Sequence, residues 1–233
     1  MSKNIYFVDM TLRDGHQSLW ATRMTTAMML PIAKAMDEVG YQRTQVMGLP
    51  QVSACLYYLR ENPFERMRLI ARAMPHTPIG TGGGSSHIGR FQISPDSVAN
   101  LWMRLWAEAG AKYTSIVDAL GSNFPDMIRM AKAATALGQK TSVALVFALS
   151  PVHTDEYYAQ KAAEMVSALA PDIFWIKDSM GLLTPERTRT LVPAILKNIG
   201  EIPLEFHSHC NNGLAPLCCL EAVRLGVKGV HTC

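Results

Sequence analysis

The sequence predicts an α/β protein of the closed (β/α)8 class, the TIM barrel. Eight short apolar segments typical of strands alternate with segments of helical periodicity along the 233 residues. This alternation implies parallel strands joined by right-handed crossovers, and the number of units matches a barrel. The alternative, an open doubly wound sheet, more often carries a G-x-G-x-x-G motif after its first strand, and the sequence has none. We expect a single barrel domain over residues 1–233.

The expected strands are short runs rich in β-branched, aromatic and other apolar residues. After the third strand, the glycine-rich stretch Thr81–Ser86 is expected to be a flexible loop, with anion binding through its backbone N–H groups as the alternative. The strands are expected at Ile5–Asp9, Thr44–Met47, Pro78–Gly80, Thr114–Asp118, Thr141–Leu149, Asp172–Lys177, Pro203–His207 and Val227–Thr232.

The expected helices are recognised by apolar residues at helical spacing and by residues that favour helix ends. Gly40 ends the first helix, because glycine readily adopts the left-handed conformation at a helix C-terminus. Ser94 and Pro95 open the fourth helix, with serine as the N-cap and proline in the first position. The helices are expected at Thr25–Val39, Val52–Leu59, Pro63–Met74, 94–109, Pro125–Leu137, Thr154–Leu169, Pro185–Asn198 and Leu214–Leu225.

The composition limits the classes of function. The chain is 48% hydrophobic and 18% charged with a net charge of +3, which is typical of a globular protein with a sizeable core. Its lysines and arginines are scattered, so no nucleic-acid surface is indicated, and no apolar run is long enough to span a membrane. The five cysteines lack disulfide or zinc-finger spacing. Together with the lack of a secretory signal, they predict a reducing compartment, the cytoplasm.

The stretch Thr11–Ser18 follows the first strand and has an unusual set of polar side chains. Arg13, Asp14 and Gln17 place a cation, a carboxylate and an amide in one glycine-containing polar turn at the C-terminal end of that strand. The set predicts a site that holds a metal or an anion. The plainer alternative is a cluster of turn and N-cap residues, since Asp and Gly are common in turns.

Further polar residues follow other strands at the same end of the predicted barrel, where the active site of this fold lies. Lys177 ends the sixth strand, and His207 and His209 end the seventh. Because the two histidines are two residues apart in an extended segment, their side chains point to the same side. Together with Asp14 they form a set of ligands for a divalent metal, and imidazole favours zinc, manganese or iron over calcium. The alternative is that both histidines are ordinary polar residues at a strand end.

Lys177 is an unexpected neighbour for a metal, because its ammonium group would repel the ion. The side chain fits only if it is neutral or carbamylated, and a carbamate supplies anionic oxygen ligands. Carbamylation requires a deprotonated amine, which a site of low dielectric constant promotes. The alternative is an ion pair of Lys177 with Asp178 or with Asp14.

Four motifs in the right order resemble the biotin-dependent carboxyltransferase barrels of pyruvate carboxylase, oxaloacetate decarboxylase and the central subunit of methylmalonyl-CoA:pyruvate transcarboxylase. The resemblance runs from residue 5 to residue 232. The wider superfamily includes isopropylmalate synthase and 3-hydroxy-3-methylglutaryl-CoA lyase, and Lys177 favours the carboxyltransferase branch. The motifs are D-M-T-L-R-D-G-H-Q-S-L-W-A-T-R at Asp9–Arg23, S-P-V-H-T at Ser150–Thr154, I-K-D-S-M-G-L-L at Ile176–Leu183 and H-S-H at His207–His209.

The resemblance implies a metal-dependent transfer of a carboxyl group between a 2-oxo acid and biotin through an enolate. Asp14, carbamylated Lys177, His207 and His209 would bind zinc or manganese. Lys177 would also be catalytic, and Arg13 and Gln17 would orient the oxo acid and stabilise its enolate. No A-M-K-M attachment motif is present, so biotin is expected on a separate carrier protein or domain, and a homo-oligomer, a dimer, is expected. The alternatives are a carbon–carbon lyase or Claisen-type synthase of the same superfamily, and an inactive assembly subunit.

Three departures from the family pattern surround this motif set. Gly83–Ser86 replaces R-G-x-N and removes the arginine that clamps a pyruvate carboxylate, although His87 or Arg90 can substitute. Ser53 replaces an acidic pocket residue, and Cys210–Gly213 replaces D-T-S-G after the histidine pair. We therefore expect ordinary pyruvate to be a poor acceptor. The sequence also ends on the eighth strand, so the barrel is expected to be C-terminally incomplete relative to the family, without the loop that supplies a proton-transferring hydroxyl.

Overall fold

The computed structural model describes residues 4–83, 94–118 and 123–233. Its strands lie close to the predicted ones, because each predicted apolar run is buried between neighbouring strands and helices. The strands are β1 (Tyr6–Asp9), β2 (Arg43–Met47), β3 (Ile79–Gly83), β4 (Tyr113–Val117), β5 (Lys140–Val146), β6 (Ile173–Asp178), β7 (Leu204–Ser208) and β8 (Gly229–Thr232).

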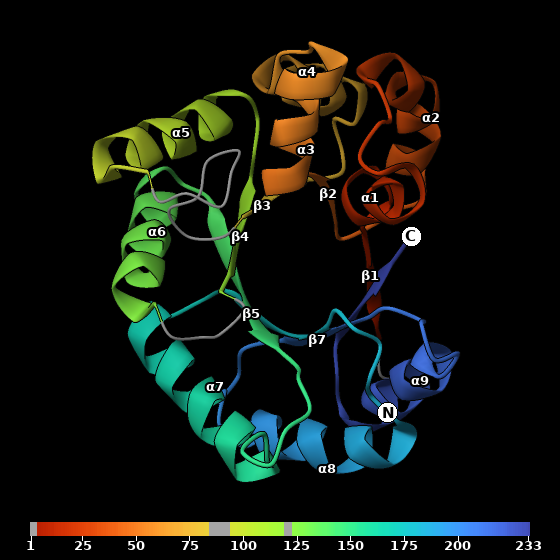
Figure 1. Cartoon of the computed structure of the whole chain (residues 1–233), viewed down its shortest axis with the longest axis vertical. Coiled ribbons are helices and arrows are strands. Elements are labelled where there is room, and N and C mark those ends of the chain that lie inside the picture. The colour runs from red at the N-terminus through yellow and green to blue at the C-terminus, as the bar shows by residue number, and fades with distance from the viewer. Residues whose placement is uncertain (1–3, 84–93, 119–122) are drawn as a thin grey trace.

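The sheet is a closed, all-parallel barrel. Each strand pairs with the next along the chain, and β8 pairs with β1 through the registers Tyr6–Gly229 to Asp9–Thr232. Figure 1 shows the helices arranged around this ring of strands. The closure confirms the predicted (β/α)8 class and excludes the open sheet. Within the described ranges, no helix has the length and apolar character needed to cross a membrane.

Four of the nine described α-helices begin where a polar side chain satisfies free N–H groups at the first turn. Side-chain caps are provided by Thr25, Asn62, Thr154 and Thr184. The predicted Ser94 cap is wrong: Pro95 occupies the N-cap position without a side-chain hydrogen bond, and its helix begins at Asp96. The helices are α1 (His16–Trp20), α2 (Thr26–Glu38), α3 (Leu49–Ala54), α4 (Pro63–Ala73), α5 (Asp96–Glu108), α6 (Phe124–Ala136), α7 (Asp155–Leu169), α8 (Pro185–Leu196) and α9 (Ala215–Leu225).

The polar stretch after β1 is helical, so the predicted turn is wrong in its local structure. Thr11–Gly15 forms a π-helical turn that continues into α1. The N–H groups of Arg13, Asp14 and Gly15 lie 3.1, 2.6 and 3.1 Å from the carbonyl oxygen of Met10. This shared acceptor at the end of β1 winds the chain tightly and holds Asp14 at the barrel mouth.

The third strand is longer than predicted, and the expected loop at residues 81–83 is wrong. Thr81, Gly82 and Gly83 continue β3 and pair with β4. A Cβ atom on Gly82 would lie 3.2 Å from the side-chain oxygen of Gln45. The glycine therefore makes room for a side chain inside the barrel, where glycine patterns alone suggest a turn. The rest of the expected loop, residues 84–86, lies outside the described residues.

The interior of the barrel contains a buried charge pair. Arg43 on β2 and Glu205 on β7 are both fully buried, and Arg43 Nη1 donates to Glu205 Oε1 at 2.6 Å. Because β1 and β8 separate these two strands in the sheet, the pair must cross the barrel. In many barrels the interior is filled with branched apolar side chains. A buried charge pair in this position therefore needs a specific explanation.

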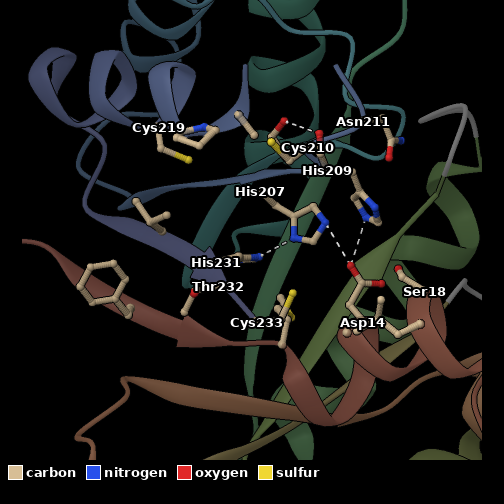
Figure 2. A pocket seen from close by; sticks show the side chains of 18 residues that line it. Asp14, Ser18, His207, His209, Cys210, Asn211, Cys219, His231, Thr232 and Cys233 are labelled. Carbon is tan, nitrogen blue, oxygen red and sulfur yellow. Dashed lines mark hydrogen bonds and ion pairs between the residues drawn. The ribbon is translucent and has the colours of Figure 1, made fainter. Parts of the chain in front are cut away.

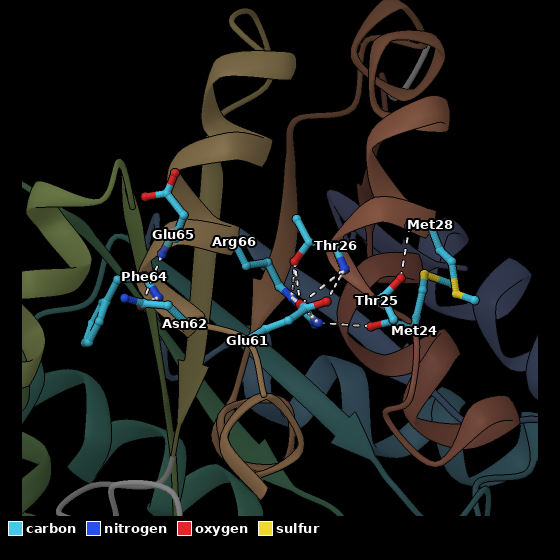
Figure 3. A network of polar contacts seen from close by, with 9 residues as sticks. All are labelled: Met24, Thr25, Thr26, Met28, Glu61, Asn62, Phe64, Glu65 and Arg66. Atoms are coloured by element: carbon cyan, nitrogen blue, oxygen red, sulfur yellow. Dashed lines mark hydrogen bonds and ion pairs between the residues drawn. The ribbon is translucent and has the colours of Figure 1, made fainter. Parts of the chain in front are cut away.

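A second polar network joins the outer helices next to the barrel mouth (Figure 3). Glu61 accepts hydrogen bonds from the backbone and side chain of Thr26 at the start of α2. Arg66 on α4 donates to the same carboxylate at 2.6 Å and to the carbonyl of Met24 at 3.0 Å. A carboxylate at a helix N-terminus is also favoured by the helix dipole. The network therefore fixes the start of α2 relative to α4.

Candidate metal and substrate site

Asp14, His207 and His209 come together at the C-terminal mouth of the barrel (Figure 2). Asp14 Oδ2 lies 3.3 Å from His207 Nε2 and 3.1 Å from His209 Nε2. One ligand atom from each residue can be chosen so that all three lie within 4.8 Å of one another. A carboxylate and two imidazoles facing one point form a donor set suited to a divalent transition metal.

The protonation states of this cluster favour cation binding. Burial alone would raise the pKa of Asp14, but the contacts with His207 and His209 and the positive charge of Arg13 hold it well below the ordinary value. Burial lowers the pKa of His207 to about 3 despite the opposing effect of Asp14, so the ring is neutral at pH 7. Its Nε2 atom is buried and makes no hydrogen bond of good geometry to any described residue. A metal ion would satisfy this nitrogen.

The segment that carries His209 is fixed by Asp178 at the end of β6. The backbone N–H of His209 donates to the carbonyl of Asp178 at 3.0 Å. The carboxylate of Asp178 accepts bonds from the Ser208 hydroxyl at 2.8 Å and from the N–H groups of Leu182 and Leu183 at 2.9 and 3.0 Å. These bonds tie the β6 and β7 ends together, which limits the movement of the two histidines.

Lys177 lies beside His207, with which it pairs in register between β6 and β7. Burial, and next the nearby charge of Arg13, lowers the pKa of Lys177 to about 8. Its Nζ atom lies 5.3 Å from the centre of the Trp175 ring. In the described part of the chain no carboxylate oxygen lies within 4.0 Å of Lys177 Nζ, although the charge of Asp14 acts from further away to raise the pKa of the amine. The ion-pair alternative is therefore wrong, and the amine is available for other chemistry.

Arg13 and Gln17 are held by a residue that sequence reasoning missed. Arg13 Nη1 bonds to Asp14 Oδ1, while Gln51 Nε2 donates to the carbonyl of Arg13 at 2.6 Å and to Gln17 Oε1 at 3.2 Å. A Cβ atom on Gly48 would lie 2.9 Å from Gln51 Oε1 and 3.2 Å from Arg13 Nε, so the glycine gives both side chains room. The available signal was a glycine and an amide directly after β2, at the active end of the barrel.

A second missed residue is His231 on β8. Its Nδ1 atom lies 3.3 Å from His207 Nδ1, and its Nε2 atom lies 2.8 Å from Glu205 Oε2. Polar residues at alternate positions of otherwise apolar strands were the available signal, because alternate residues face the barrel interior. The sequence alone does not reveal which of these residues meet.

A cavity of about 610 Å³ adjoins the three candidate ligands. Its walls include the apolar side chains of Leu19 and Val230 as well as the polar side chains of Ser18 and Asn211. This volume accommodates a small ligand and shields it partly from water. The two predicted substrate-binding residues His87 and Arg90 lie outside the described residues.

Comparison with known proteins identifies the family. The family model described as HMGL-like matches residues 110–233, more than half of the chain. The chain belongs to this family. The expected resemblance is thereby confirmed at the family level.

Individual relatives narrow the comparison within the HMGL-like family. A pyruvate carboxylase subunit of Methanocaldococcus jannaschii is 36% identical over 97% of this chain and 39% of its own length. The 2-oxoglutarate carboxylase large subunit of Hydrogenobacter thermophilus is 30% identical over 99% of this chain and 35% of its own length. The chain thus spans roughly two fifths of the curated relatives it matches. These relatives favour carboxyl transfer over the lyase and synthase alternative.

Solved structures give the same result for the fold. The carboxyl transferase domain of Rhizobium etli pyruvate carboxylase, determined with pyruvate and biocytin, superposes with a TM-score of 0.91. The identity is 26%, and the match covers 99% of this chain and 39% of that one. The match therefore extends over all elements of the barrel described above.

Proposed function

We propose that this chain is the carboxyl-transferring barrel of a biotin-dependent carboxylase that acts on a 2-oxo acid. The observation that carries the proposal is the cluster of buried Asp14 and His207 with half-buried His209 at the mouth of a barrel. The superposed R. etli domain is described with pyruvate and biocytin. Biotin would reach the mouth on a carrier protein or domain, and the assembly would be a homo-oligomer, a dimer.

The residues at the mouth fit a divalent metal, zinc or manganese. Asp14, His207 and His209 would hold it, and carbamylated Lys177 would complete the ligand set. The buried Nε2 atom of His207, which lies 3.3 Å from Asp14 Oδ2 without a well-aligned hydrogen bond, supports this assignment. When bound, the metal supplies a Lewis acid for the carbonyl group of the oxo acid.

The other side chains would act on the substrate itself. Arg13 bonds to Asp14 through one nitrogen, while its Nε atom is buried without a partner among the described residues. Its positive charge is placed to stabilise the negative charge that develops as the oxo acid becomes an enolate. Gln17, held by Gln51, would orient the acid. Carboxyl transfer would then form a carbon–carbon bond at the enolate carbon as the carbon–nitrogen bond of carboxybiotin breaks. The proton that the oxo acid lost on forming the enolate would end on the released nitrogen of biotin.

The acceptor is proposed to be larger than pyruvate. The replacement of the family's R-G-x-N by Gly83–Ser86 removes a charge-assisted contact to the substrate carboxylate. A longer or differently charged oxo acid that reaches His87 or Arg90 would recover it. The relative named as a 2-oxoglutarate carboxylase makes 2-oxoglutarate the first candidate.

Proton exchange in heavy water tests enolate formation separately from carboxyl transfer. The protein is supplied with manganese or zinc, and exchange at carbon 3 of pyruvate and of 2-oxoglutarate is followed by NMR. Decarboxylation of oxaloacetate and oxalosuccinate is then measured with and without biocytin. We expect exchange with 2-oxoglutarate to exceed that with pyruvate, and decarboxylation to require biocytin.

Two aspartate variants provide the matched comparison. Asp14→Asn removes a candidate ligand and should abolish both reactions. Asp172→Asn alters a carboxylate at the opposite end of the barrel, where it accepts a bond from Thr141 N at 2.8 Å, and should leave both intact. Cleavage of the oxo acid chain without biocytin would overturn the proposal in favour of a lyase.

A further inference from the structure

A continuous chain of contacts crosses the barrel interior and ends on a candidate metal ligand. Arg43 binds Glu205 through two nitrogens, and the second oxygen of Glu205 lies 2.8 Å from His231 Nε2. His231 Nδ1 in turn lies 3.3 Å from Nδ1 of His207. The side chains of Arg43 and Glu205 are fully buried, and that of His231 is 1% exposed. Nothing in the site described above requires such a costly arrangement.

The carboxylate of Glu205 determines which atom donates and which accepts in each hydrogen bond of this chain. It accepts two bonds from Arg43, a third from the Tyr6 hydroxyl at 2.9 Å and a fourth contact from His231. An ionised carboxylate has about four lone-pair sites and no proton to give. Every group around Glu205 must therefore donate, and His231 Nε2 carries a proton.

The remaining protons follow from the chemistry of imidazole. A neutral ring has one donor and one acceptor nitrogen, so His231 Nδ1 accepts. His207 Nδ1 must then carry the proton that it donates to His231. As a result His207 Nε2 presents a lone pair to the space it shares with Asp14 and His209. This Nε2 makes no well-aligned hydrogen bond to Asp14 Oδ2, although the two atoms lie 3.3 Å apart. In this tautomer both atoms present lone pairs, and a cation between them would satisfy both.

We propose that His231 is a positioning residue that holds His207 in the tautomer required for metal binding. The inference rests on the proposed metal site and adds to it the group that prepares one of its ligands. Trp175 keeps the two rings in place, since its ring centre lies 4.8 Å from that of His231 and 5.6 Å from that of His207. The charge pair of Arg43 and Glu205 anchors the chain at its far end. Partners of this kind typically change metal affinity by about 10- to 100-fold.

Three substitutions of His231 separate hydrogen bonding from packing. Asn places an acceptor oxygen close to the Nδ1 position, Gln places its amide close to the Nε2 position, and Leu provides neither. Zinc and manganese affinities are measured by competition with a chelator. We expect His231→Asn to stay within about threefold of the native protein, and the Gln and Leu variants to lose roughly 10- to 100-fold. The control is His76→Leu, which alters a side chain that is 83% exposed on the surface. It should leave the zinc and manganese affinities unchanged.

Nitrogen NMR of the native, metal-free protein tests the tautomer directly. The His207 signals are assigned by their loss in His207→Gln, and the expected spectrum has the proton on Nδ1. A spectrum with the proton on Nε2, or native metal affinity in folded His231→Leu, would overturn the proposal. If the native protein binds neither metal, the proposed metal site fails, and the spectrum still decides the assignment of the tautomer.

Discussion

Lys177 allows a direct test of carbamylation. Burial lowers its pKa from 10.5 to about 8. At pH 7 about a tenth of the amine is then neutral, which is roughly 300 times the fraction expected for an unperturbed lysine. Only the neutral amine reacts with CO2, so this shift makes carbamylation accessible near neutral pH.

The expected carbamate makes metal uptake depend on dissolved CO2. Lys177→Ala should weaken metal binding, and Lys177→Glu should partly restore it because glutamate supplies a carboxylate. Removing bicarbonate during reconstitution of the metal-free protein should slow uptake in the native protein but not in the Glu variant. At fixed CO2, uptake by the native protein should increase as the pH rises through about 8, because deprotonation of Lys177 precedes the reaction.

Metal stoichiometry by elemental analysis, at controlled bicarbonate and pH, provides the measurement. Lys34→Ala is a suitable control, since this side chain is 86% exposed on α2. Equal metal content in the native protein and both Lys177 variants would discard the carbamate. It would also remove the main feature of the site that favours carboxyl transfer over carbon–carbon cleavage.

Two further predictions concern stability. Glu205→Gln leaves Arg43 buried without its counter-charge and should cost about 3–5 kcal/mol at pH 7. The pKa of Glu205 is lowered from 4.5 to about 2, so its stabilisation is complete above pH 4.5 and is lost as the pH falls toward 2. Urea unfolding should show the two proteins converging in that window, and a constant difference would contradict this. Gly181→Ala should cost about 1–3 kcal/mol and weaken metal binding, because the added Cβ would lie 2.3 Å from the carbonyl oxygen of His209. Gly200→Ala has a similar positive φ but open space around it, so an equal loss of metal affinity there would refute the role of the clash.

The order and type of the main elements could be predicted from the sequence, because the strands are short runs rich in apolar residues and the helices have their own periodicity. Residues at the strand ends could also be predicted to share one mouth, since all parallel strands point the same way. The local backbone geometry was harder to predict from the sequence. The π-helical turn at Thr11–Gly15 depends on one carbonyl with several donors, and β3 continues through glycines that resemble a loop.

The interior contacts were beyond prediction for a different reason. Alternation along β2, β7 and β8 indicates which residues face inward, but contact across the barrel depends on closure and stagger. Arg43 and Glu205 are 162 positions apart in the chain and belong to strands that do not pair. His231 lies in a short apolar run, where a single histidine gives no sign of its partners. The residues that prepare the site are therefore found only once the sheet is closed.

The chemical state of Lys177 determines the net charge at the barrel mouth. Arg13 and Asp14 form an ion pair and cancel each other, and the ring of His207 is neutral at pH 7. An ammonium group on Lys177 would leave a net positive site that repels a divalent ion, and a neutral amine would leave no net charge. Only a carbamate makes the site anionic. If the site takes up a metal as proposed, deprotonation of Lys177 would come first, reaction with CO2 second and metal binding last. Retention of the metal would then follow the supply of CO2.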